Sequence, residues 1–221
     1  MKTNKFTILA MIAGITALTA CGGKKETVNA GEEQQVAQAT ELSKTFNVDV
    51  ASSTLGWTGT KVTGKHFGKI GIQTGSISVE KNEIKAGSFV IDMKTITVED
   101  LTDEETNKKL AGHLASADFF DVEKYATSKF EITGVEKLQT PDADGNNYKI
   151  MGNLTIKDIT KNITIPANVN MDENQFTAKA KFSIDRTEWN IQYGSGKFFK
   201  GLGDKMINDA IEFDLNLVAK P

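Results

Sequence analysis

The sequence predicts an all-β domain, one antiparallel sheet of about eight strands with one short helix inserted between two of them. Eight or nine segments alternate apolar and polar residues with a period of two, as strands with one buried face do. The 221 residues include only three prolines but 12 phenylalanines, and threonine, isoleucine and valine are abundant, which favours strands. Nothing repeats at a fixed period, so a propeller or a solenoid is not expected.

The alternating segments follow one another at the spacing of hairpins. The apolar residues that share a parity are, in chain order, Phe46, Val48 and Val50; Leu55 and Trp57; Ile70 and Ile72; Ile77 and Val79; Phe89, Ile91 and Met93; Phe130 and Ile132; Tyr148, Ile150, Leu154 and Ile156; Ile163 and Ile165; Phe176, Phe182 and Ile184; and Ile211, Phe213, Leu215 and Leu217. The parity shifts at Ala86-Gly87-Ser88, which predicts a β-bulge. Pro166 has no N–H to donate, so its strand is expected at an edge or a barrel seam.

One stretch, "LTDEETNKKLAGHLASADFF", breaks the alternation. Thr102 and Glu105 have the spacing of a capping box, and Leu110 and Leu114 stand four residues apart. These features predict a helix from about Asp103 to Leu114 that lies across one end of the sheet.

An antiparallel sheet with one apolar face can bury it by closing into a barrel or by folding into a sandwich. A barrel of eight strands has an interior that is either filled with side chains or holds one small ligand. The positions expected to face inward hold phenylalanine and tryptophan as well as small residues such as Gly59, Gly152, Ala178 and Ala180. Small residues serve tight packing or leave a lumen, and composition does not decide between these.

The first 21 residues predict a lipoprotein signal. Lys2 and Lys5 precede an apolar run from Phe6 to Leu18, which is short for a membrane span and typical of a signal peptide. Leu18-Thr19-Ala20-Cys21 resembles the bacterial lipobox, with a signal peptide over 1–20. We expect Cys21, the only cysteine, to be acylated with palmitate-type chains and to anchor the protein in a membrane. The alternative is a plain signal peptide with an incidental cysteine.

Residues 21–44 are predicted to be a flexible tether between this anchor and a barrel domain over 45–221. Residues 22–44 contain no aromatic residue, and such a coil would span on the order of 25 Å. Gly22 is not the aspartate associated with inner-membrane retention, so the expected location is the bacterial envelope, at the outer membrane and facing the periplasm. Surface export stays open.

Charge and motifs exclude several function classes. The net charge of −3 becomes −5 once the two signal-peptide lysines are removed, which argues against a nucleic-acid partner. Only His66 and His113 are available as imidazole ligands, and no nucleotide-binding or hydrolase motif occurs. We therefore expect no enzymatic activity, no catalytic residue and no metal site.

Arg186 is the only arginine among 26 basic residues, and its parity continues that of Phe182 and Ile184. A buried guanidinium needs a partner. It is expected to pair with an acid such as Glu188, or to lie beside the polar head of a ligand, or to be exposed. The pairs Phe119-Phe120 and Phe198-Phe199 are expected to plug the core or to line a ligand entrance.

Four longer stretches identify a resemblance: "SFVIDMKTITVED", "HLASADFFDVEKYATSKFEITGV", "YKIMGNLTIKDITKNITIPANV" and "FSIDRTEWNI". Together they resemble the YceI-like proteins, a bacterial envelope family, over roughly residues 45–219. The resemblance implies an eight-stranded lipocalin-like antiparallel barrel that encloses a long isoprenoid or fatty-chain lipid.

The resulting expectation is non-enzymatic binding, storage or transport of a long apolar lipid in the barrel lumen. The lipid would be a polyisoprenoid, an isoprenoid quinone or a fatty-acyl chain, with no other cofactor. The predicted lumen residues are Trp57, Phe89, Ile91, Phe130, Ile150, Leu154, Phe182, Ile184 and Arg186. A ligandless barrel serving as an envelope scaffold or stress protein is the alternative, and a lipid-modifying enzyme the third hypothesis. Both a single chain and a homodimer are compatible with the sequence.

Overall fold

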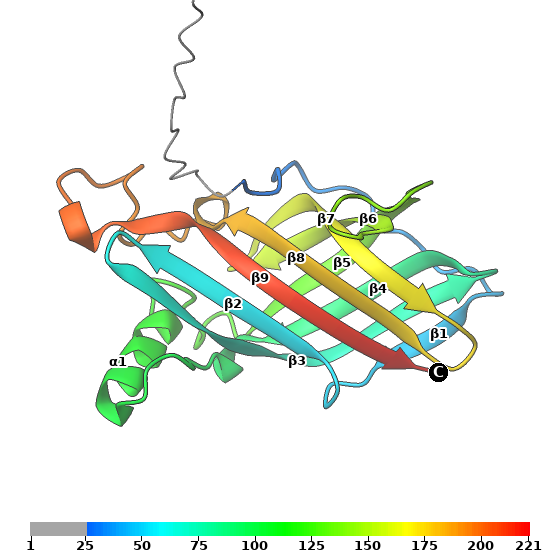
Figure 1. The fold of residues 1–221 in the computed structure, drawn as a ribbon, viewed down its shortest axis with the longest axis horizontal. Coiled ribbons are helices and arrows are strands. Elements are labelled where there is room, and N and C mark those ends of the chain that lie inside the picture. The colour runs from blue at the N-terminus through cyan, green and yellow to red at the C-terminus, as the bar shows by residue number, and fades with distance from the viewer. Residues whose placement is uncertain (1–25) are drawn as a thin grey trace, which may run out of the picture.

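The computed structural model describes residues 26–221, so the predicted signal peptide and Cys21 lie outside the described residues. Figure 1 shows a barrel of long tilted strands with a helix at one end. The strands are β1 (Lys44–Val48), β2 (Thr54–Lys61), β3 (Gly64–Glu80), β4 (Glu83–Asp92), β5 (Thr127–Lys137), β6 (Tyr148–Ile156), β7 (Ile159–Met171), β8 (Phe176–Asp185) and β9 (Ile207–Lys220). The helices are α1 (Glu104–Ala115) and the short 3₁₀ helices η1 (Met93–Thr95), η2 (Arg186–Trp189) and η3 (Gly203–Lys205).

The strands form one antiparallel sheet that closes on itself through the pairing of β3 with β4. β1 and β2 share one position in the ring, because both lie between β3 and β9. The 17 residues of β3 are long enough to pair with both strands in turn: Trp57 lies opposite Gly68, and Phe46 opposite Ile77. Nine strand segments therefore make an eight-stranded barrel, as predicted, and the sandwich alternative is wrong.

The helix lies across one end of the barrel, as predicted, but its N-cap differs from the predicted one. The side chain of Asp103 accepts hydrogen bonds from the backbone N–H (2.9 Å) and the hydroxyl (2.9 Å) of Thr106. Asp103 therefore caps the helix one residue after Thr102. Its carboxylate accepts both bonds at once, and these bonds lower the pKa of Asp103.

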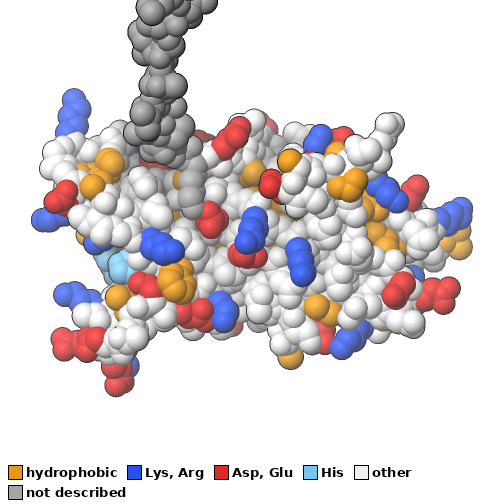
Figure 2. All heavy atoms as spheres, viewed as in Figure 1, with side chains coloured by type: hydrophobic (Ala, Val, Ile, Leu, Met, Phe, Trp, Pro, Cys, Tyr) orange, Lys and Arg blue, Asp and Glu red, His pale blue; other side chains and the backbone are white. Residues whose placement is uncertain are grey.

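The core of the barrel consists of two apolar clusters. The smaller cluster packs against α1 and consists of Trp57, Ile70, Ile91, Met93, Val98 and Val122; we call it the cluster below α1. At the far end, Phe46, Tyr148 and Phe176 belong to the larger cluster, and the rings of Phe46 and Phe176 lie 6.5 Å apart. Aromatic side chains are therefore buried at the far end. On the outside, acidic and basic side chains are interspersed (Figure 2).

The barrel wall has a seam between β7 and β8. The two strands pair only where Asn168–Met171 lie opposite Phe176–Lys179. The other half of β7, from Ile159 to Ala167, pairs with β6 but with no residue of β8. Pro166 lies in this half, so the missing N–H of proline falls where no neighbouring strand requires it. The seam predicted from Pro166 is confirmed.

The segment before β1 crosses this seam, and we call residues 28–37 the N-terminal strap. The N–H of Val28 donates to the Ser183 carbonyl of β8 (2.8 Å), while Gly31 exchanges two backbone hydrogen bonds with Asn162 of β7 (2.8 and 3.0 Å). Farther along, Ala37 donates to the Ile132 carbonyl of β5 (2.9 Å). Through its backbone the strap, blue in Figure 1, thus joins three strands, β8, β7 and β5.

The structure contradicts the predicted flexible tether for the strap residues. The prediction rested on the scarcity of apolar side chains, but the strap is held mainly through its backbone. It satisfies polar groups that the seam leaves without a ladder partner, and such groups are costly when buried and unpaired. Val28 and Ala30 also pack against the main core.

Asn153 of β6 fastens the strap, and its replacement by alanine is expected to destabilise the protein. Its side chain is 2% exposed; it accepts from Gln34 N (3.0 Å) and donates to Gln34 O (2.7 Å). Asn153→Ala is expected to lower the free energy of unfolding by about 1–3 kcal/mol, measured by urea denaturation. Asn170→Ala, an exposed asparagine on β7, is the control and should change it by less than about 0.5 kcal/mol. Equal effects would contradict the fastening role.

Candidate functional site

The barrel encloses a cavity of about 160 Å³. All residues on its wall are apolar except Ser128. The cavity lies inside because alternate residues of every strand point inward, and the inward parity is apolar in each of them. A volume of this size accommodates roughly ten water-sized groups. The cavity therefore offers apolar contacts and a single polar side chain.

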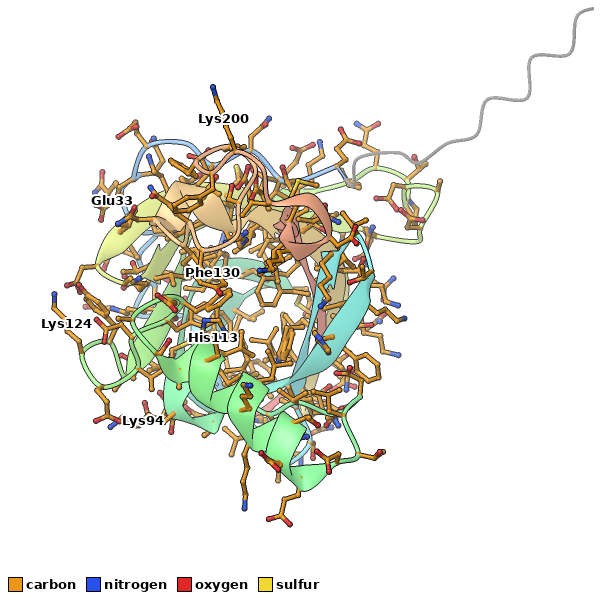
Figure 3. The ribbon with its side chains drawn as sticks, turned by 90° about the vertical axis from the view of Figure 1, so that its left-hand side faces the viewer. Glu33, Lys94, His113, Lys124, Phe130 and Lys200 are labelled. Atoms are coloured by element: carbon orange, nitrogen blue, oxygen red, sulfur yellow. The ribbon has the colours of Figure 1, made fainter. Side chains whose placement is uncertain are left out.

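Two pairs of phenylalanines narrow the cavity from opposite sides of the ring. Phe182 and Phe213, from β8 and β9, stack with their centroids 5.5 Å apart. Phe89 and Phe130, from β4 and β5, lie 6.3 Å apart in a tilted arrangement. Figure 3 looks into the end that carries α1, with Phe130 inside the ring of strands.

Small residues that point inward allow tight packing at some positions and leave room for the cavity at others. A Cβ on Gly152 would lie 2.2 Å from Cζ of Phe130, so this glycine makes room for the phenylalanine ring. Ala178 and Ala180, in contrast, line the cavity. The two alternatives that the sequence left open therefore both occur, at different positions.

Six of the predicted lumen residues lie on the cavity wall: Phe89, Ile91, Phe130, Ile150, Leu154 and Phe182. Trp57 does not, because it belongs to the cluster below α1, where its indole Nε1 donates to the Thr97 carbonyl (3.1 Å). Ile184 does not line the cavity either and is packed in the main core. Parity gave the direction of these side chains but not their depth along the barrel axis.

Other wall residues were not among the predicted ones, although most follow the same parities. They are Leu55, Ile70, Ile72, Ile77, Ile84, Met93, Phe120, Ser128, Ile132, Ile156, Ile163, Ile165, Ala167, Val169, Phe176, Ala178, Ala180, Phe213, Leu215 and Leu217. The alternation alone would have found nearly all of them. Phe120 is the exception, since it lies in the loop after α1 and no strand pattern points to it.

Arg186 is not a lumen residue, which corrects the prediction. It is 2% exposed and lies in η2. Its guanidinium donates to the carbonyls of Ile191 (2.8 Å), Ile207 (3.3 Å) and Asn208 (3.3 Å). Its charge partner is Asp209, at 3.4 Å, and not Glu188. Burial lowers the pKa of the guanidinium, and Asp209 opposes this shift. Because β8 ends at Asp185, the side chain leaves the strand parity and ties η2 to β9.

The paired phenylalanines have different positions. Phe119 is buried and plugs the core, whereas Phe120 lines the cavity. Phe198 and Phe199 are each 48% exposed, so the prediction that this pair plugs the core or lines an entrance is wrong.

His113 lies on α1 at the rim of the barrel end that Figure 3 shows. Its ring meets Phe119 (5.0 Å) and Tyr193 (4.7 Å) edge to face, and Nε2 lies 3.0 Å from Asp118 Oδ2. The other histidine, His66, pairs with Asp100 (2.8 Å), and neither residue lines the cavity. Among residues 26–221, no group of three or more His, Cys, Asp or Glu side chains is arranged to hold a metal ion.

The pair of His66 and Asp100 predicts a pH-dependent stability. Burial raises the pKa of Asp100, but hydrogen bonds from Phe67 N (3.0 Å) and His66 Nδ1 (2.8 Å) outweigh it and lower the pKa. A lowered carboxyl pKa gives stability that is full at neutral pH and is lost below about pH 4, as the pH falls through the lowered pKa.

Asp100→Asn is therefore expected to cost about 1–2 kcal/mol of unfolding free energy at pH 7, with the difference from wild type shrinking toward pH 2. Urea unfolding between these pH values measures it. Asp118→Asn, which alters the more exposed pair with His113, is the control and should cost less than about 0.5 kcal/mol. A cost for Asp100→Asn that does not change with pH would contradict the role of the charge.

A closed eight-stranded antiparallel barrel with an apolar interior defines the lipocalin-like class of folds. The family model described as "YceI-like domain" matches residues 46–219. The chain therefore belongs to the YceI-like family, as its sequence motifs indicated.

Curated relatives match over part of this range. A UPF0312 protein of Serratia proteamaculans is 33% identical over 88 residues, which cover 37% of this chain and 43% of that protein. A UPF0312 protein of Pseudomonas aeruginosa is 33% identical over 101 residues, covering 46% of this chain and 47% of that protein. The chain thus spans less than half the length of the relatives it matches.

Solved structures share the fold. BcnA of Burkholderia cenocepacia superposes with a TM-score of 0.59 at 23% identity, covering 78% of this chain and 99% of BcnA. A polyisoprenoid binding domain from Saccharophagus degradans gives a TM-score of 0.56 at 12% identity, covering 84% of this chain and 99% of that domain. At these identities the likeness concerns the fold. In residues 26–221, no helix has the length and apolar character needed to cross a membrane.

Proposed function

We propose that this protein binds the apolar chain of a lipid inside its barrel and holds or carries it without catalysing a reaction. The observation that carries the proposal is the cavity, whose wall is apolar at every position except Ser128. A packed interior, as the scaffold hypothesis requires, would leave no such space. The polyisoprenoid-binding domain with the same fold supports an isoprenoid chain as the first ligand class to test, before a fatty-acyl chain.

The energetics of transfer suit such a ligand. Each buried methylene contributes about 0.8 kcal/mol. A chain of roughly ten water-sized groups, the amount that the cavity accommodates, would gain about 8 kcal/mol before the cost of association. This gain is large enough for binding without any charged contact. A longer polyisoprenoid would extend beyond the cavity.

Lipid extraction tests the proposal directly. The mature protein, purified from membranes, would be analysed by native mass spectrometry and by organic extraction. We expect a co-purifying lipid of one class. A protein that is empty and takes up neither added polyprenol nor added fatty alcohol would overturn lipid binding and favour the scaffold hypothesis.

We further propose that acylated Cys21 anchors the barrel to the outer membrane, facing the periplasm. Because the strap begins at Val28, only six residues separate it from Cys21, and these seven Cα–Cα steps reach at most about 25 Å. The barrel would then lie close to the bilayer from which it takes its ligand. Mass spectrometry of the mature N-terminus tests this, and an unmodified Cys21 would overturn it.

A further inference from the structure

Ser128 is the one polar residue on the cavity wall, and its hydroxyl has no partner. The residue is 6% exposed. Its Oγ is the only buried side-chain nitrogen or oxygen atom of residues 26–221 that lacks a hydrogen-bond partner. Buried hydroxyls in native proteins are almost always paired, and an unpaired one costs free energy. An isolated hydroxyl in an otherwise apolar wall therefore points to a partner that the cavity receives.

The position of Ser128 gives the ligand an orientation. Ser128 is the second residue of β5 and lies opposite Ile91 of β4. The neighbouring segment of the wall includes Met93 and Phe120, next to the cluster below α1. Everywhere else the wall of the cavity is apolar. A chain in the cavity would thus direct its apolar tail away from Ser128 and present its first polar atom to the Ser128 hydroxyl.

The wall also restricts the charge of that atom. No Lys, Arg, His, Asp or Glu side chain lines the cavity, so a carboxylate or phosphate beside Ser128 would be buried without a counter-charge, which is strongly unfavourable. A serine hydroxyl can both donate and accept one hydrogen bond at this site. The chemistry that fits is a single neutral oxygen, such as a ketone, ester carbonyl or alcohol.

We propose that Ser128 Oγ forms the single polar contact of the cavity and selects apolar chains that carry a neutral oxygen near their head. The inference rests on the proposed function, since it requires a chain in the cavity. It adds a specificity residue and excludes an ionised head group from the cavity itself, so that any charged group of the lipid lies outside the barrel.

Three probes of equal chain length test the proposal: dodecan-2-one, dodecane and dodecanoate. Their affinities for the mature protein would be measured by displacement of N-phenyl-1-naphthylamine, a neutral apolar dye. We expect wild type to prefer the ketone over dodecane by about 10-fold and to show no preference for dodecanoate at pH 8. In Ser128→Ala the ketone preference should disappear while dodecane affinity is retained.

Two further variants make the result specific. Ser128→Thr keeps a hydroxyl and should restore the ketone preference. Ser183→Ala removes a buried serine of β8 that does not line the cavity, and it should leave the preference unchanged. Infrared spectra provide a second readout, because the ketone C=O stretch should shift to lower frequency in wild type and not in Ser128→Ala.

The outcomes separate the two proposals. If the dye and all three probes fail to bind wild type, the proposed function fails and the role of Ser128 fails with it. If ketone and alkane bind but Ser128→Ala keeps the ketone preference, or if dodecanoate binds best at pH 8, only the role of Ser128 is overturned.

Discussion

Replacing Arg186 with methionine is expected to lower the free energy of unfolding by about 3–5 kcal/mol. The guanidinium is 2% exposed and donates to three backbone carbonyls besides pairing with Asp209. Methionine fills much of the volume but leaves these buried acceptors and the Asp209 carboxylate without their donors. Arg186→Lys should also be destabilising. The planar guanidinium donates to several acceptors in different directions, and a single ammonium group cannot reach all of them. Guanidinium chloride unfolding measures both.

Lys197 provides a matched control, because it pairs with Asp185, the residue before Arg186. Lys197 is half exposed, and Lys197→Met should cost less than about 1 kcal/mol. Ligand affinity gives a second test. Since Arg186 does not line the cavity, the folded fraction of Arg186→Lys should bind apolar chains as wild type does. A selective loss of affinity in a stable Arg186→Lys variant would instead support the head-group role predicted from the sequence.

Arg186 shows what strand alternation can and cannot predict. The alternation predicted the strands and six residues of the cavity wall, because side-chain direction within a strand follows from sequence parity alone. The choice of a barrel over a sandwich came from the family resemblance. It failed at Arg186 because the strand ends at Asp185 and η2 begins. The alternation also could not predict how far along the barrel axis Trp57 lies. This depth depends on the strand register and on the loop at residues 96–101, which packs against Trp57.

Backbone hydrogen bonding was the second feature that the sequence could not fully predict. Pro166 located the seam in advance, because a missing N–H is visible in the sequence. The strap that fills the seam was not predictable in this way, because its hydrogen bonds come from backbone groups that every residue carries. The bulge shows the same limit: the parity shift placed it at residues 86–88, whereas the register shifts between Ile84 and Ala86, opposite Val79 and Ser78.

Filling the cavity is expected to abolish ligand binding. Ala180 of β8 lies on the wall and is 4% exposed. In Ala180→Phe the ring would enter the cavity of about 160 Å³ and occupy space that the apolar chain requires. Each methylene excluded from the cavity removes about 0.8 kcal/mol of transfer free energy. Exclusion of four methylenes therefore weakens binding by more than about 100-fold. Displacement of N-phenyl-1-naphthylamine from the mature protein measures the affinity.

Lys179→Phe is the matched control, because the neighbouring residue points outward and is exposed. It adds the same ring to the same strand without entering the cavity, so it should leave affinity unchanged. The stability of Ala180→Phe separates two explanations for lost binding. A cavity that is open in the free protein accepts the ring at little cost, whereas a tightly packed interior would be destabilised by about 1–3 kcal/mol. Lost binding with retained stability therefore requires that ligand and ring compete for the same pre-existing space. Retained binding would place the ligand site outside the barrel.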